Sequence, residues 1–104
     1  MSMSRKQHDY IVKVAKHITS QTKIVPLEDD LYDQKEYGAY GLIYPFLCSE
    51  DIYYVGTLER GDTVIQNDLE WYAKEYYGLT NSEIYDLIDV YQAMVSQKLK
   101  KLIN

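Results

Sequence analysis

Hydrophobic residues recur at helical spacing near the N-terminus of the chain. Residues 4–19 carry apolar side chains at i, i+3, i+4 and i+7, which predicts a helix with one apolar stripe. The stripe comprises Ile11, Val14, Ala15 and Ile18. Ser4 followed three residues later by Gln7 has the pattern of a capping box and places the start of this helix.

Helical spacing returns in the last third of the chain. Residues 68–77 predict a second helix, with Asn67 and Glu70 as a capping pair and Gly78 at its C-terminal end. This helix is expected to bury Leu69, Tyr72, Ala73 and Tyr76.

A final helix begins at the capping pair Thr80 and Glu83. Its apolar positions keep helical spacing for five turns: Ile84, Leu87, Ile88, Tyr91, Met94 or Val95, Leu99 and Leu102. We expect the part beyond about residue 96 to overhang the core, where a partner or a second copy of the chain can bind.

The pattern between these helices changes to that of strands. Residues 40–48 alternate, with Tyr40, Leu42, Tyr44, Phe46 and Cys48 on one face. Because Pro45 lacks an N–H, this strand is expected at a sheet edge or to contain a bulge. Residues 49–51 make a turn, and residues 52–58 are rich in strand-forming side chains and predict the returning strand.

Two further short strands complete the prediction. Residues 63–66 form either a third strand or, with Thr63 as a cap, an early start of the following helix. A short strand at residues 23–25 precedes Pro26. The predicted order is a helix, two or three antiparallel strands and two helices. It indicates a single α+β domain over residues 1–104 with a small meander sheet.

Composition is that of a soluble folded protein. The chain has 104 residues, of which 46% are hydrophobic and 26% charged. It shows no secretory signal and no apolar run long enough for a membrane span. Cys48 is the single cysteine, so an internal disulfide is excluded, and we interpret it as a packed thiol in a cytoplasmic protein.

Charge is sorted along the chain. The net charge of −5 divides into +4 for residues 1–23, −12 for residues 24–89 and +3 for residues 90–104. Part of this pattern matches the dipole of the final helix, which begins with acids and ends with three lysines. Nine further acids at positions 28–62 are predicted in loops and turns, so the sequence favours a strongly acidic middle region between two basic ends.

Twelve tyrosines accompany the acids. A tyrosine ring contributes contact area at small entropic cost, and its hydroxyl tolerates water. We therefore expect acids and tyrosines of the middle region to form a partner-binding surface. Its candidate residues are Glu28, Asp29, Asp30, Tyr32, Asp33, Glu36, Tyr37, Glu50 and Asp51.

Motifs for catalysis, cofactors and metals are missing from the sequence. The five glycines follow neither dinucleotide-binding nor phosphate-loop spacing. His8 and His17 are nine residues apart, so they lie about half a turn apart on a helix and do not converge on one metal. We expect a protein that is not an enzyme and that uses no cofactor or metal.

Three functions remain open. The favoured one is a small acidic protein-interaction module with a basic partner. It includes the special case of a DNA mimic that inhibits a nucleic-acid enzyme, a class that phages and mobile elements often carry. The alternative is nucleic-acid binding by the basic terminal helices, with stacking on Tyr44, Tyr53 and Tyr54 of the strands. The third is an uncharacterised enzyme or small-ligand domain.

Overall fold

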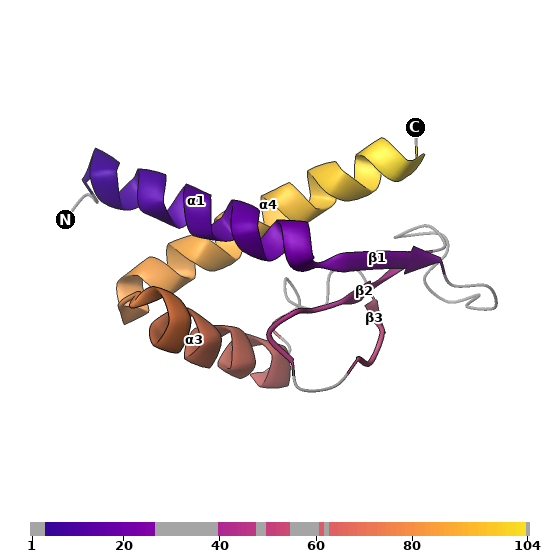
Figure 1. Ribbon diagram of the computed structural model, residues 1–104, viewed down its shortest axis with the longest axis horizontal. Coiled ribbons are helices and arrows are strands. Elements are labelled where there is room, and N and C mark those ends of the chain that lie inside the picture. The colour runs from indigo at the N-terminus through magenta and orange to yellow at the C-terminus, as the bar shows by residue number, and fades with distance from the viewer. Residues whose placement is uncertain (1–3, 27–39, 48–49, 55–60, 62, 104) are drawn as a thin grey trace.

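The computed structural model describes residues 4–26, 40–47, 50–54, 61 and 63–103. Within these residues the chain forms three helices and three strands (Figure 1). In chain order they are α1 (Arg5–Gln21), β1 (Lys23–Pro26), β2 (Tyr40–Ile43), β3 (Tyr53–Tyr54), α3 (Thr63–Tyr77) and α4 (Asn81–Ile103). The predicted α+β class, with one N-terminal helix and two C-terminal helices, is confirmed.

The start of α1 follows the predicted capping box. The Gln7 N–H donates to Ser4 Oγ over 3.2 Å, and the Ser4 N–H donates to Gln7 Oε1 over 3.1 Å. These bonds satisfy two backbone donors that have no partner within the helix. The predicted stripe of four apolar residues is buried, with at most 2% of each side chain exposed. It faces α4, against which α1 crosses (Figure 1).

The sheet has the order β1-β2-β3, with both pairs antiparallel. The predicted edge position of the strand that begins at Tyr40 is wrong, because β2 is central and has a neighbour on each side. The reason is its length: β2 ends at Ile43, so Pro45 lies outside the ladder and removes no hydrogen bond from it. Of the predicted returning strand, Tyr53–Tyr54 forms β3, and residues 55–58 lie outside the described residues.

The helix α3 begins earlier than the 68–77 prediction. Residues 63–66 are helical, so the third-strand prediction is wrong and the alternative of an early helix start is confirmed, with Thr63 as the first helical residue instead of the expected cap. Ile65 is fully buried and extends the stripe of Leu69 and Ala73 by one turn, which accounts for the earlier start. The predicted capping pair is also wrong, because Asn67 lies inside the helix and Glu70 forms an ion pair with Lys74.

The junction between α3 and α4 follows the sequence signals. Gly78 has φ +65°, a left-handed conformation that glycine adopts without steric cost, and its N–H donates to the Lys74 carbonyl over 3.2 Å. Two residues later the Thr80 N–H donates to Glu83 Oε1 over 2.9 Å, which caps α4 as predicted. One prediction on α3 fails, because Tyr76 is 65% exposed and not buried.

Tyr91 lies at the centre of the core with 1% of its surface exposed. Its ring contacts those of Phe46 and Tyr44 at centroid distances of 6.2 and 6.4 Å. Thr22 Oγ1 donates its only proton to the Ile18 carbonyl over 2.7 Å. The Tyr91 hydroxyl, 2.7 Å from Thr22 Oγ1, is therefore the donor of that second bond. This pair joins the end of α1 to the middle of α4.

The C-terminal part of α4 packs against the end of α1. Leu99 is buried, and Lys98 Nζ donates to the carbonyls of Thr19 and Thr22 over 3.0 and 2.8 Å. The expected overhang from about residue 96 is therefore wrong. The exposed end begins at Lys100, because Leu99 still fits the apolar stripe that covers α1.

We predict that Lys98→Met lowers the free energy of unfolding by about 1–2 kcal/mol, because two backbone carbonyls at the end of α1 lose a charged donor. Lys100→Met is the matched control, since Lys100 is exposed on the same helix. Urea denaturation of both variants measures the difference. Equal, small losses would show that the Lys98 bonds contribute nothing to stability.

Candidate functional site

Most of the predicted acidic surface belongs to one chain connection. Glu28, Asp29, Asp30, Tyr32, Asp33, Glu36 and Tyr37 lie outside the described residues. They belong to residues 27–39, here called the acidic segment, which joins β1 to β2. Its two flanks, Pro26 and Tyr40, are register partners in the sheet. The chain therefore leaves the sheet and re-enters it at neighbouring positions, so five acids are attached to one end of the sheet.

Glu50 and Asp51 are the two candidates that the structure describes, and both are exposed. They precede β3, in which Tyr53 pairs with Leu42 towards the end of β2. The acidic segment attaches to the other end of β2, at Tyr40. The two groups of candidates thus join the sheet at opposite ends of a four-residue strand, which spans about 10 Å. The sheet does not bring them to a common strand end.

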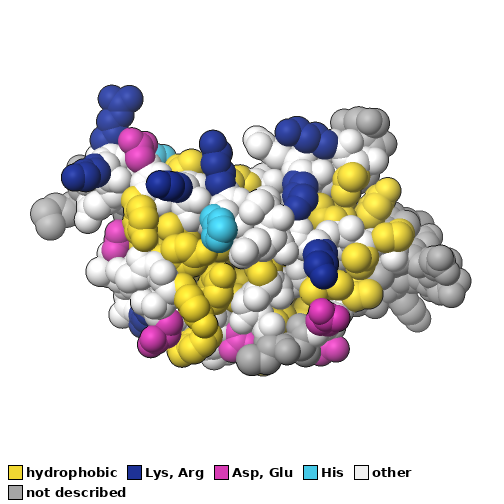
Figure 2. Space-filling model, viewed as in Figure 1, with side chains coloured by type: hydrophobic (Ala, Val, Ile, Leu, Met, Phe, Trp, Pro, Cys, Tyr) yellow, Lys and Arg dark blue, Asp and Glu magenta, His cyan; other side chains and the backbone are white. Residues whose placement is uncertain are grey.

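Bases of the two chain ends lie on the same side of the molecule. On the face shown in Figure 2, Lys and Arg lie mostly along the edge formed by α1 and the C-terminal part of α4, and Asp and Glu lie mostly along the opposite edge. We call this edge the basic side. It comprises the exposed residues Arg5, Lys6, Lys13 and Lys16 of α1 and Lys100 and Lys101 of α4. α1 and α4 cross, so the N-terminal bases of α1 and the C-terminal bases of α4 lie towards opposite ends of this edge (Figure 1).

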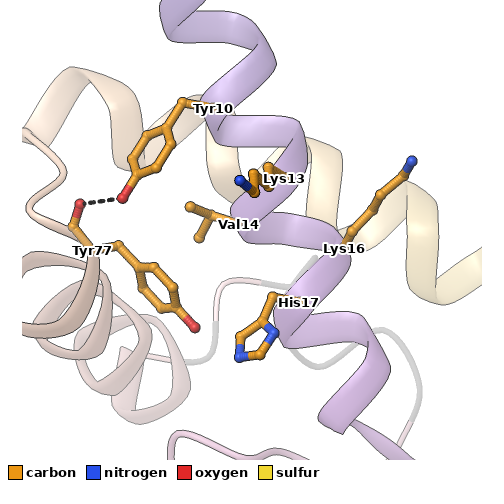
Figure 3. Close-up of a pocket in the computed structure, with 6 residues that line it drawn as sticks. All are labelled: Tyr10, Lys13, Val14, Lys16, His17 and Tyr77. Atoms are coloured by element: carbon orange, nitrogen blue, oxygen red, sulfur yellow. Dashed lines mark hydrogen bonds between the residues drawn. The ribbon is translucent and has the colours of Figure 1, made fainter.

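A groove lies beside the basic side, between α1 and the C-terminal end of α3 (Figure 3). It has a volume of about 540 Å³. Its lining residues are Tyr10, Lys13, Val14, Lys16, His17 and Tyr77. The Tyr10 hydroxyl donates to the Tyr77 carbonyl over 3.0 Å, and the His17 ring meets the Tyr77 ring edge-on at a centroid distance of 6.2 Å. These contacts hold the two helices together at the rim of the groove.

The hydroxyl of Tyr77 stays protonated at neutral pH. Burial raises the pKa of Tyr77 to about 12, and the neighbouring Tyr72 adds to the shift. The group is therefore a neutral hydrogen-bond donor beside His17 (Figure 3). Sequence reasoning missed this groove, although Tyr10, Val14 and His17 recur at helical spacing and share one face of α1.

Other sequence predictions concern histidine, tyrosine and cysteine residues that lie outside the acidic segment. His8 and His17 are both exposed on α1, as expected, and among the described residues no group of three His, Cys, Asp or Glu side chains could hold a metal ion. Tyr44 is 3% exposed and packs in the core, so its predicted role as a stacking surface is wrong. The cause is that Tyr44, directly after β2, packs against α4, where its ring meets that of Tyr91. Cys48 lies outside the described residues.

We predict that stability falls as the pH rises above about 10, the pKa of tyrosine in an unfolded chain. Burial raises the pKa values of Tyr91 and Tyr77 in the folded state, so the unfolded state loses protons first. Their contribution is complete below pH 10 and is lost as the pH rises through the folded pKa. Thermal melting from pH 8 to 11 measures this loss, and Tyr77→Phe should reduce it. A melting temperature that stays constant over this range would contradict the prediction.

None of the helices in the described part of the chain combines the length and the hydrophobicity that are needed to span a membrane.

Comparison with known proteins identifies no relative. Neither the protein-family models nor the curated proteins nor the solved structures give a match to this chain.

Proposed function

We propose that this protein is a non-enzymatic protein-binding module that docks onto a basic partner through its acidic segment, Glu50 and Asp51. The separation of charge carries the proposal. On the face shown in Figure 2 the bases gather on the basic side and the described acids lie mostly away from it, while the sequence concentrates five further acids in the acidic segment. In the described ion pair, Lys74 neutralises Glu70 within α3, and Lys98 is bonded to backbone carbonyls.

The physical basis of the proposal is electrostatic steering. Like charges that are concentrated on one surface attract an oppositely charged partner over several ångströms and raise its association rate. Tyr32 and Tyr37 lie among the acids in sequence and can supply contact area after the encounter. The finer form of the proposal is an inhibitor that occupies the nucleic-acid channel of a cytoplasmic enzyme, because such channels are lined by lysine and arginine.

Differential capture tests the proposal. The wild-type protein and Asp29→Lys/Asp33→Lys are immobilised, and bacterial lysate proteins retained at low and at high salt are quantified. Asp86→Lys/Asp89→Lys is the matched control, since it changes the net charge equally at exposed positions of α4. A basic protein retained by the wild type and the control, but not by the first variant, is the expected result. Equal retention by all three proteins would overturn the proposal.

Nucleic-acid binding is the second candidate function. The position of both basic chain ends along one edge favours it, because a line of basic side chains can follow a phosphate backbone. In this case Tyr44 does not stack on a base, since it is buried, whereas Tyr53 of β3 is half-buried. A gel shift with single-stranded and double-stranded DNA tests it. Binding that weakens steeply with salt is expected, and no shift at low salt would exclude this function.

A further inference from the structure

We propose that the groove between α1 and α3 binds a nucleotide unit, with its base against the aromatic side chains and its phosphate against the lysines of α1 (Figure 3). The proposal rests on the second candidate function and gives that function a site. A volume of about 540 Å³ lies within the range of small-ligand sites. A free nucleotide and one nucleotide of a single strand both present a base and a phosphate to this groove.

Positive charge at the groove comes from α1. Lys13 and Lys16 are exposed on successive turns, and His17 lies on the second of them. None of the six described side chains that line the groove is acidic. Asp9, one turn before Lys13, is the acid of the same helix. The lining therefore carries a net positive charge, which favours a phosphate and disfavours a neutral or cationic ligand.

Aromatic rings line the groove from both helices, Tyr10 from α1 and Tyr77 from α3 (Figure 3). Tyr10 is 43% exposed, and its hydroxyl is fixed to the Tyr77 carbonyl. In Figure 3 the Tyr10 and Tyr77 rings flank Val14, which closes the floor between them, and Lys16 extends away from the rings. Lys13 is consequently the better placed cation for a ligand held by the rings. A base gains roughly tenfold in affinity from stacking on one such ring.

A chain of ring contacts continues from the groove along α3. Tyr77 meets Tyr72 at 5.7 Å, Tyr72 meets Tyr76 at 4.9 Å, and Tyr76 meets Trp71 at 5.9 Å. The last two rings are 65% and 55% exposed. A free nucleotide fills only the groove, whereas a strand of several nucleotides can follow this row of rings. The row therefore favours single-stranded nucleic acid as the source of the nucleotide.

The side chains beside the row of rings carry both negative and positive charge, so the row offers no purely basic surface for phosphates. Glu70 is paired with Lys74 over 2.8 Å, and Glu75 is exposed. Phosphate contacts are thus expected at the groove, and stacking is expected to dominate along α3. Trp71 is the single tryptophan, so quenching of its fluorescence reports a base that reaches the end of the row.

Fluorescence anisotropy with a labelled oligothymidylate of about eight nucleotides, a length within the site sizes of single-strand binders, tests the proposal at low salt. AMP is added as the competitor that represents a free nucleotide. We expect Lys13→Glu and Tyr10→Leu each to weaken binding about tenfold, the size of one lost phosphate or stacking contact. Lys101→Glu makes the same charge change at the exposed end of α4 and should weaken binding less than threefold. Thermal melting verifies that each variant is folded.

The outcomes distinguish a failure of the groove site from a failure of nucleic-acid binding as a whole. Equal weakening by Lys13→Glu and Lys101→Glu would overturn the groove site but leave nucleic-acid binding by the basic side intact. Absence of binding by both probes would overturn both. An octamer that binds at least tenfold tighter than AMP and quenches Trp71 assigns the groove to a strand, and comparable affinities assign it to a free nucleotide.

Discussion

Replacing Tyr91 with alanine should lower the free energy of unfolding by about 3–5 kcal/mol, the range for removing a large buried aromatic side chain. The ring is 1% exposed and contacts Tyr44 and Phe46, so its removal leaves a cavity between α4 and the segment that follows β2. Small folded proteins have only about 5–15 kcal/mol of stability in total. Urea denaturation of the variant is expected to show a midpoint far below that of the wild type.

Two conservative variants distinguish the contribution of the Tyr91 hydroxyl hydrogen bond to stability from the contribution of ring packing. Tyr91→Phe should cost about 1 kcal/mol, because Thr22 keeps its bond to the Ile18 carbonyl. Thr22→Val should cost more, about 1–3 kcal/mol, because the Tyr91 hydroxyl is then buried without an acceptor. Combining both changes should restore part of that loss. If Tyr91→Phe costs more than Thr22→Val, the assignment of Tyr91 as the donor is wrong.

Reversing two charges of the acidic segment should slow association with a basic partner by about tenfold or more, since steering changes association rates by factors of about 10–1,000. The variant is Asp29→Lys/Asp33→Lys, and the partner is the protein retained in the differential capture. Because surface substitutions usually change stability by no more than about 0.5 kcal/mol, thermal melting should be nearly unchanged. Surface plasmon resonance measures the association and dissociation rates.

The control for this result is Asp86→Lys/Asp89→Lys. It shifts the net charge equally, but at exposed positions of α4, so its association rate should fall less. A large loss of stability in Asp29→Lys/Asp33→Lys would instead give the acidic segment a structural role. In that case the slower association would reflect unfolding and not electrostatics.

Local signals in the sequence predicted α1, the end of α3 and the start of α4 well. The capping box of Ser4 and Gln7, the left-handed Gly78 and the pair of Thr80 and Glu83 are satisfied by bonds within a few residues, so they depend little on the rest of the fold. The apolar stripes of α1 and α4 were likewise predictable. Each stripe must face a partner, and the two helices bury them against each other.

Features that depend on distant contacts were predicted poorly. The sequence shows Pro45 but does not show that β2 ends before it, because strand length is set by pairing with β1 and β3. Thr63 begins a helix because Ile65 finds a buried place in the core, which strand propensity does not reveal. Tyr76 has helical spacing with Tyr72 but lies outside the covered stripe.

The acidic segment and the groove also differ in how far they could be predicted from the sequence. The acidic segment was predictable as a concentration of charge, because its residues are contiguous in sequence. The groove and the basic side were not, since they combine α1 with α3 and α4, which lie far apart along the chain. Periodicity identified the faces of α1, and only the crossing of the helices showed which residues lie opposite them.

The dependence of the association rate on ionic strength is the most direct measurement of how the acidic residues act. For the wild-type protein and its captured basic partner, the rate should fall steeply between about 50 and 300 mM salt, where screening of exposed charges grows. For Asp29→Lys/Asp33→Lys the slope should be much shallower. A wild-type rate that does not change with salt, or equal slopes for both proteins, would contradict a function in which the acids of residues 28–37 guide the partner.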